Sequence, residues 1–119
     1  YDVGAHIGTY AILALKRSAP AGRVVAYEPF AYTRKFLAQH LQWNACAERA
    51  HVRDACCGAA AGTAEFYFAP GQAEGMNGLV PVAGFSRMTV RVVTLDAEVA
   101  ELGLVPDLIK IDVEGFEPR

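Results

Sequence analysis

The chain has 119 residues, of which 53% are hydrophobic and 20% are charged, and its formal net charge at pH 7 is −2. This composition predicts one compact domain with a buried core and excludes a disordered chain. The weak negative charge argues against a basic surface for nucleic acid, and no apolar run approaches the roughly 18 residues of a membrane span.

Alternating strand and helix patterns occupy the first half of the chain. The opening residues YDVG are typical of a strand end and a turn, and the next residues predict a helix over 8–17 that Pro20 ends. A buried strand, RVVAYEP, precedes a helix over 31–44 in which Leu37 and Leu41 face inward. We expect HVRDACCG to form a third strand.

The second half begins with two alternating segments, GTAEFYFAPG and MTVRVVTLD, that are typical of strands. A glycine-rich stretch with the turn pair Asn77-Gly78 separates them, which predicts an antiparallel flap. A short helix, LDAEVAELG, and a strand in PDLIKIDVEG, whose apolar run stops at Asp112, complete the order. Near-continuous apolar strands such as LIKI favour a sheet covered on both faces.

The order of elements predicts an α/β fold with a Rossmann-like, doubly wound, mostly parallel sheet and a β-hairpin flap before the fourth parallel strand. Ligands of such sheets bind outside the carboxyl ends of the strands. Four acidic residues are predicted at those ends, and they are Asp2, Glu28, Asp54 and Asp112. We therefore expect the ligand at this rim, where a carboxylate such as Glu28 should bury little surface.

The loop after the first strand reads D-x-G-x-x-x-G, with Asp2, Gly4 and Gly8. Glycines let a backbone approach a ligand closely, and N–H groups at a helix start can face it. The dinucleotide fingerprint G-x-G-x-x-G and the Walker loop are both absent. Glu28 follows Gly8 by 20 residues, where a carboxylate accepts hydrogen bonds from ribose hydroxyls. The pattern predicts a ribose without a pyrophosphate, as in S-adenosylmethionine.

These stretches carry a resemblance to the FkbM family of S-adenosylmethionine-dependent methyltransferases. The matching segments are DVGAHIGTYAI, VVAYEP, the helix ending in WN, VRDACCGAAAGTAEFYF, TLD and, most specifically, PDLIKIDVEGFE. The resemblance implies methyl transfer from S-adenosylmethionine to a small-molecule acceptor, most often a hydroxyl oxygen of a sugar, a polyketide or a similar compound. It also implies that residues 1–119 are a single partial domain, truncated at both ends, and inactive alone.

By resemblance, the cofactor site draws on the first three strand ends and the glycine loop, through Asp2, Gly4, Ala5, Gly8, Glu28 and Asp54. Asp2 would brace the loop and face the methionine amino group, and Glu28 would bind the ribose. Asp54 would lie near the adenine, or else be a solvated residue paired with Arg53 or Arg91.

Asp112 and Glu114 would lie at the mouth of the cofactor site, where they orient the acceptor or remove its proton. The alternative role of Asp112 is to accept hydrogen bonds from the turn that contains Gly115. His6 has a near-neutral pKa in the unperturbed state, but a side chain of such a loop is expected to pack or to point outward. His40 and His51 are expected on surfaces or helix faces.

Metal and disulfide sites are not expected. The cysteines Cys46, Cys56 and Cys57 are odd in number and lack C-x-x-C spacing, and no two histidines have the spacing of metal ligands. Reduced, mostly buried thiols favour a cytoplasmic protein. Adjacent thiols at 56 and 57 should point to opposite faces of a strand.

Two other functions remain open at this point. The first is a non-catalytic adenosine-binding or interaction module that has the same fold. The second is a nucleotide-binding Rossmann enzyme, which the missing G-x-G-x-x-G disfavours.

Overall fold

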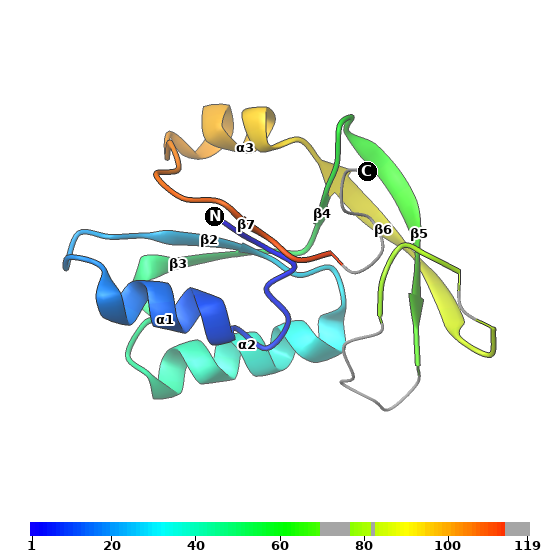
Figure 1. Ribbon diagram of the computed structural model, residues 1–119, viewed down its shortest axis with the longest axis horizontal. Helices are drawn as coiled ribbons and strands as arrows, with labels where there is room; N and C mark the ends of the chain where they lie inside the picture. Colours follow the sequence, from blue (N-terminus) through cyan, green and yellow to red (C-terminus); the bar gives the residue numbers. More distant parts are fainter. Residues whose placement is uncertain (70–76, 82, 114–119) are drawn as a thin grey trace.

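The computed structural model describes residues 1–69, 77–81 and 83–113, which form two sheets (Figure 1). The first sheet has the order β3-β2-β1-β7, and all neighbouring strands in it are parallel. Its strands are β1 (Asp2–Val3), β2 (Val24–Tyr27), β3 (Ala50–Arg53) and β7 (Lys110–Ile111). The second sheet is mixed and has the order β4-β6-β5. The predicted α/β class with a Rossmann-like parallel sheet is confirmed.

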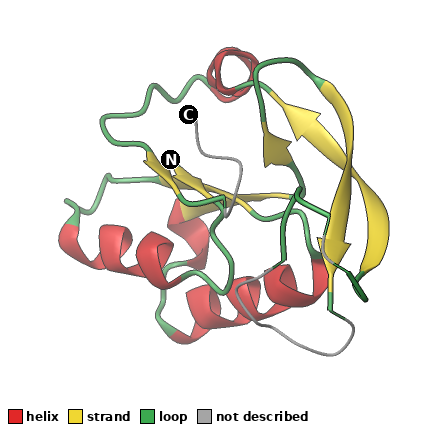
Figure 2. Cartoon of the chain, turned by 45° about the vertical axis from the view of Figure 1, so that its right-hand side comes forward, coloured by secondary structure: helices red, strands yellow, loops and turns green. Residues whose placement is uncertain are grey.

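Helices cover both faces of the parallel sheet (Figures 1 and 2). Helices α1 (Thr9–Arg17) and α2 (Ala31–Trp43) lie on one face, and α3 (Leu95–Leu102) lies on the other. Because strand side chains alternate, Val24 and Ala26 of β2 pack towards α1 and α2, whereas Val25 and Tyr27 pack towards α3. The predicted inward positions of α2, Leu37 and Leu41, are 0% and 2% exposed.

The register of the parallel sheet places the first residue after each strand in one row. Val3 pairs with Tyr27 and with Ile111, and Tyr27 pairs with Arg53. The row that follows comprises Gly4, Glu28, Asp54 and Asp112. Asp2 belongs to β1 itself and is buried, so the expectation that four acidic residues share the rim is wrong for Asp2.

The second sheet stands across the carboxyl ends of the parallel strands (Figure 2). Strands β5 (Gly62–Phe68) and β6 (Ser86–Val93) form the antiparallel hairpin that the sequence predicts before the fourth parallel strand. The hairpin is tied to the start of α2, because the ring of Phe30 lies 6.1 Å from that of Phe66 and 4.8 Å from that of Phe68. The flap therefore packs against the parallel sheet next to its rim.

The predicted third strand is two strands in two different sheets. Strand β3 ends at Arg53, and β4 (Cys56–Cys57) pairs with β6, whose Val93 carbonyl accepts a 2.9 Å hydrogen bond from Gly58. The edge of β6 thus satisfies backbone groups that the parallel sheet does not. The two thiols point to opposite faces, as predicted, because Cys56 packs with the flap and Cys57 with the α3 side.

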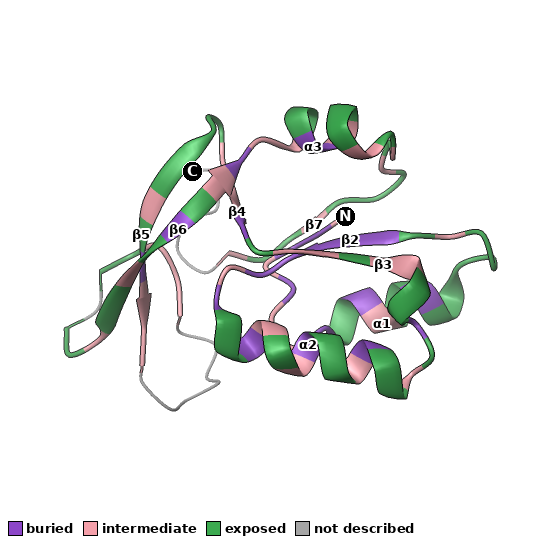
Figure 3. Cartoon of the chain, turned by 180° about the vertical axis from the view of Figure 1, so that it is seen from behind, coloured by how far each residue is buried: buried purple, intermediate pink, exposed green. Residues whose placement is uncertain are grey.

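Strand β7 is less covered than its apolar sequence predicts. Among the described residues it pairs with β1 alone, and the side chains of Leu108, Ile109 and Ile111 are exposed. Figure 3 shows the contrast with β2, which is buried along its whole length. Because these apolar side chains are exposed, the expectation of cover on both faces is wrong for β7. None of the described helices is long and apolar enough to cross a membrane.

Candidate functional site

A cavity of about 180 Å³ lies where β1, β2 and β7 end beside the flap. Gly4 lines it, together with the polar side chains of His6, Glu28, Thr33, Asn77 and Asp112. The rest of the lining is mostly apolar and includes Val3, Tyr27, Ala55, Cys56, Cys57, Phe66, Leu79 and Val113. Of the eight residues predicted for the site, the structure brings Gly4, Glu28 and Asp112 together at this cavity.

Glu28 is buried and organises its surroundings. Its Oε2 accepts a 2.8 Å hydrogen bond from the His6 backbone N–H, and its Oε1 accepts bonds from the Phe30 N–H (3.0 Å) and the Thr33 hydroxyl (2.8 Å). Glu28 is 6% exposed, so the expectation that it buries little surface is wrong. A carboxylate has about four lone-pair sites. The three hydrogen bonds from the protein occupy three of these sites, which leaves about one site for a ligand.

The glycine loop is held by the protein itself. The N–H groups of Gly4 and Ala5 both donate to the Tyr27 carbonyl, at 3.1 and 3.0 Å, and that of Gly8 donates to the Ala5 carbonyl. With the His6 N–H on Glu28, these four groups have partners inside the protein. The expectation that the loop N–H groups face a ligand is therefore wrong for these residues. Ala5 is buried in the core beside α1 and α2.

Two glycines in this loop are required by packing. Gly4 and Gly8 have φ values of 74° and 92°, a region that other residues adopt only with strain. A Cβ on Gly4 would collide with the Asp112 carbonyl oxygen, and one on Gly8 would collide with the Leu37 side chain. The absence of a side chain at Gly4 thus allows the end of β7 to lie close to the loop. The same absence at Gly8 allows α2 to lie close to it.

His40 braces the same loop from α2. Its Nδ1 lies 2.9 Å from the Ile7 carbonyl oxygen. Because a carbonyl only accepts, Nδ1 carries the proton. The sequence predicted a surface or helix-face position for His40, and its helical spacing gave no signal for this contact.

Lys110 links Asp2 to the loop. Its Nζ lies 3.1 Å from Asp2 Oδ1, donates a 2.9 Å hydrogen bond to the Gly4 carbonyl, and stands 5.0 Å above the Tyr10 ring. Asp2 is 4% exposed and does not line the cavity, so it faces Lys110 inside the protein. Sequence reasoning missed Lys110, although a single cation inside the apolar run LIKID was a signal that could have found it.

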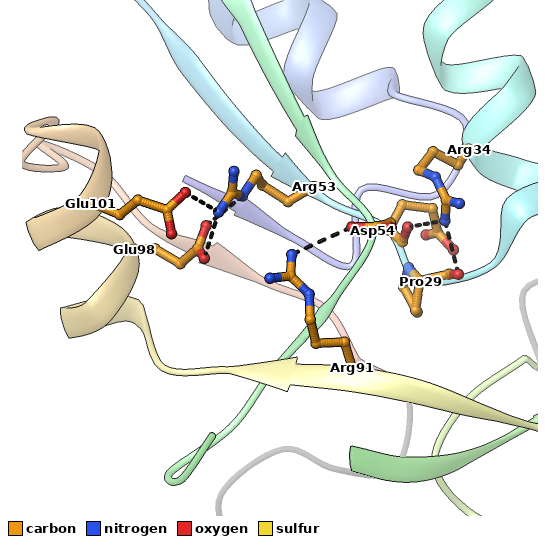
Figure 4. A network of polar contacts seen from close by, with 8 residues as sticks. Pro29, Arg34, Arg53, Asp54, Arg91, Glu98 and Glu101 are labelled. Carbon is orange, nitrogen blue, oxygen red and sulfur yellow. Dashed lines mark hydrogen bonds and ion pairs between the residues drawn. The ribbon is translucent and has the colours of Figure 1, made fainter. Parts of the chain in front are cut away.

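The remaining predicted carboxylates have different surroundings. The Asp112 side chain is 58% exposed, lines the cavity, and lies 3.8 Å from Lys110 Nζ. Asp54 is exposed, forms a 3.3 Å ion pair with Arg91 of β6 (Figure 4), and does not line the cavity. Glu114 lies outside the described residues.

A charged network beside the cavity anchors α3. Arg53 Nε lies 2.7 Å from Glu98 Oε2, and Arg53 Nη2 donates a 2.7 Å hydrogen bond to Glu101 Oε1 (Figure 4). The hydrogen bonds that Arg53 donates, first to Glu98 and then to Glu101, raise its pKa above the ordinary value. The Glu98 carboxylate is 3% exposed, and its pairing with Arg53 joins α3 to β3.

Three cavity side chains are uncharged near neutral pH. Burial raises the pKa of Cys56 to about 11 and that of Cys57 to about 12, so neither thiol is a nucleophile there. Burial also raises the pKa of Tyr27, whose fully buried hydroxyl has no hydrogen-bond partner in the described part of the chain. Within the same part, no group of three or more histidine, cysteine or acidic side chains is placed to hold a metal ion.

A comparison with known families identifies the family of the chain. The sequence model of the methyltransferase FkbM domain matches residues 2–118. The chain belongs to the FkbM methyltransferase family. The resemblance carried by its sequence motifs is thereby confirmed. No curated protein and no solved structure matches the chain.

Membership of the FkbM family gives the chain a chemistry. The family uses S-adenosylmethionine, and it implies a small-molecule methyl acceptor. The strand order β3-β2-β1-β7 corresponds to the 3-2-1-4 half of a Rossmann-like sheet, whose ligands bind outside the carboxyl strand ends. The FkbM cavity lies at that edge.

Proposed function

We propose that this FkbM domain transfers the methyl group of S-adenosylmethionine to a hydroxyl oxygen of a small molecule, and that the transfer takes place at the cavity beside Gly4. The observation that carries the proposal is the placement of two unlike carboxylates on one cavity. Glu28 is buried and braced, whereas Asp112 is exposed. Such an acidic pair suits a cationic ligand better than an anionic one.

The residues present fit the cofactor. Glu28 keeps about one acceptor site for a ribose hydroxyl, as its three existing bonds indicate. The cavity volume of about 180 Å³ lies below the ~300–1,000 Å³ of common small-molecule pockets, so it suits a nucleoside better than a whole cofactor. The amino-acid end would then lie towards Asp112, whose carboxylate is exposed.

When bound, S-adenosylmethionine would supply an electrophilic methyl carbon, with S-adenosylhomocysteine as the leaving group when an acceptor oxygen bonds that carbon. The work of the chain is to align the acceptor, which can supply roughly 7–11 kcal/mol of the barrier. Asp112 is the exposed carboxylate at the cavity, so it accepts a hydrogen bond from the acceptor hydroxyl and takes up its proton as the transfer proceeds. A general base of this kind adds about 10²–10⁴-fold. The family resemblance implies that Glu114 also orients the acceptor or removes its proton, and the proposal includes this role.

The test is an acceptor screen with methyl-labelled S-adenosylmethionine and small-molecule alcohols, including sugars and hydroxylated polyketides. We expect S-adenosylhomocysteine to form only with a hydroxylated acceptor, and the label to appear as a methyl ether. Tight cofactor binding without turnover of any acceptor would favour the non-catalytic adenosine-binding module. Transfer to nitrogen or carbon would contradict the hydroxyl assignment alone.

A further inference from the structure

The flap places at the cavity an amide whose NH₂ group has no partner in the described part of the chain. Asn77 Oδ1 accepts a 3.2 Å hydrogen bond from the Ala69 N–H, and the neighbouring Gly78 exchanges two backbone bonds with Tyr67, at 2.8 and 3.0 Å. These contacts fix Asn77 to β5. The partner of Oδ1 is an N–H donor, so the amide orientation is determined and the group left over is the Nδ2 donor.

The free donor of Asn77 requires an acceptor. Nδ2 is buried and has no hydrogen-bond partner among residues 1–69, 77–81 and 83–113. A buried polar group without a partner is costly, and in a native protein it calls for an explanation such as a ligand or an ordered water. Asn77 lines the cavity that Glu28 also lines, so a ligand held by Glu28 lies within the same enclosure.

The wall around Asn77 is apolar. Phe66 is 5% exposed, and it packs with Leu79 and Cys56 in the cluster that joins the flap to Phe30. All of these side chains except Phe30 line the cavity. A flat ligand group with apolar faces and a hydrogen-bond acceptor at its edge matches this wall and its single donor.

The two ends of the cavity suit different parts of the cofactor. At the end beside Gly4, the Asp112 carboxylate is largely exposed, which suits the charged amino-acid part. The described residues at the flap end are mostly apolar and include the Asn77 amide donor, which suits a purine, whose ring nitrogens accept hydrogen bonds. A ribose at Glu28 joins the two parts.

We propose that Asn77 recognises the adenine of the cofactor, with its Nδ2 donating a hydrogen bond to a ring nitrogen while Phe66 and Leu79 pack against the base. The inference rests on the proposed function, which puts the cofactor in this cavity. It replaces Asp54, the residue that sequence resemblance placed near the adenine. The Asp54 carboxylate pairs with Arg91 and does not line the cavity.

The test measures dissociation constants of S-adenosylhomocysteine by calorimetric titration. The ligands are the parent compound and its 1-deaza, 3-deaza and 7-deaza analogues, each of which replaces one ring nitrogen by C–H. The proteins are wild type, Asn77→Ala and the control Gln39→Ala, whose amide is on the exposed face of α2. We expect Asn77→Ala to weaken binding of the parent about 3- to 10-fold, and Gln39→Ala to leave it unchanged.

In wild type, one deaza analogue should bind more weakly than the parent compound by the same factor. In Asn77→Ala, that analogue and the parent compound should bind with equal affinity. Asn77→Asp keeps the Oδ1 acceptor for Ala69 and removes the donor, so it should weaken the parent at least as much as Asn77→Ala, with melting temperature as the folding control. An unchanged dissociation constant in Asn77→Ala, or equal analogue losses in both proteins, would overturn the adenine assignment alone. No binding of S-adenosylhomocysteine to wild type would overturn the proposed function as well.

Discussion

On the β2 side of the cavity, Glu28 is 6% exposed and accepts three hydrogen bonds, whereas on the β7 side the Asp112 side chain is 58% exposed. Both residues follow their strands in the same row. The difference arises because β2 is central and β7 is at the edge of the sheet. An acidic residue after a strand therefore braces the structure on one side and leaves a carboxylate available for chemistry on the other. We expect losses of stability on the first side and losses of turnover on the second.

The largest effect on stability is expected for Gly4→Ala, which breaks the contact between the two sides. The substitution forces a positive φ on alanine and drives a Cβ into the Asp112 carbonyl. Strain and overlap together should lower the free energy of unfolding by about 4 kcal/mol. Denaturant unfolding measures this change in the free energy of unfolding. The control Gly62→Ala meets no atom within 4 Å and should stay within about 0.5 kcal/mol. Similar losses in both variants would contradict the packing role of Gly4.

Lys110→Met should have the next largest effect, because Lys110 ties β7 to the loop. It leaves Asp2 buried without its 3.1 Å partner and removes the donor of the Gly4 carbonyl. Breaking a buried pair in this way should cost about 3 kcal/mol. Lys110→Arg keeps the charge and should recover part of the loss, and the exposed control Lys16→Met should cost little. Equal melting temperatures for Lys110→Met and Lys16→Met would show that Asp2 does not depend on Lys110.

Sequence patterns predicted the parts of the fold that depend on local periodicity. The order of strands and helices, the inward face of α2 and the hairpin all follow from the spacing of apolar residues and from turn signals. The sequence did not reveal that the segment of the third predicted strand divides at Asp54. That division depends on the edge of β6, which lies more than thirty residues further along the chain.

Sequence position correctly indicated which residues lie at the cavity where the end of a strand decides their placement. Glu28 and Asp112 lie at the cavity because parallel strands end at one edge. Asp2 and Asp54 do not line it, because their partners, Lys110 and Arg91, come from distant strands. Such pairings are properties of the folded chain, and no short motif encodes them.

A smaller effect, of opposite sign, is expected for Tyr27→Phe on the braced side. The hydroxyl of Tyr27 is fully buried and unpartnered within the described ranges. Removing a buried polar group that has no partner should raise the free energy of unfolding by about 1 kcal/mol. Chemical denaturation gives the value. A loss of stability of that size would mean that the hydroxyl has a partner, and that the β2 side depends on it.

The smallest effect on stability, within about 0.5 kcal/mol, is expected for Asp112→Asn, because its side chain is largely exposed. Turnover should instead fall about 10²–10⁴-fold while cofactor affinity changes little, if the carboxylate takes the acceptor proton. Steady-state kinetics and titration of cofactor separate the two quantities. Equal losses of turnover and of affinity, with a lower melting temperature, would assign Asp112 to bracing the turn.

The central claim is that Glu28 holds the ribose of the cofactor while it braces the loop. Glu28→Gln tests it, because the amide oxygen can keep the bonds from Phe30 and Thr33 while the amide NH₂ replaces the acceptor that faces His6. Calorimetric titration of S-adenosylmethionine into wild type, Glu28→Gln and the exposed control Glu48→Gln is the most direct measurement. The account predicts that affinity falls about 5- to 30-fold, or about 1–2 kcal/mol, in Glu28→Gln alone. A folded Glu28→Gln that binds the cofactor as tightly as wild type would contradict it.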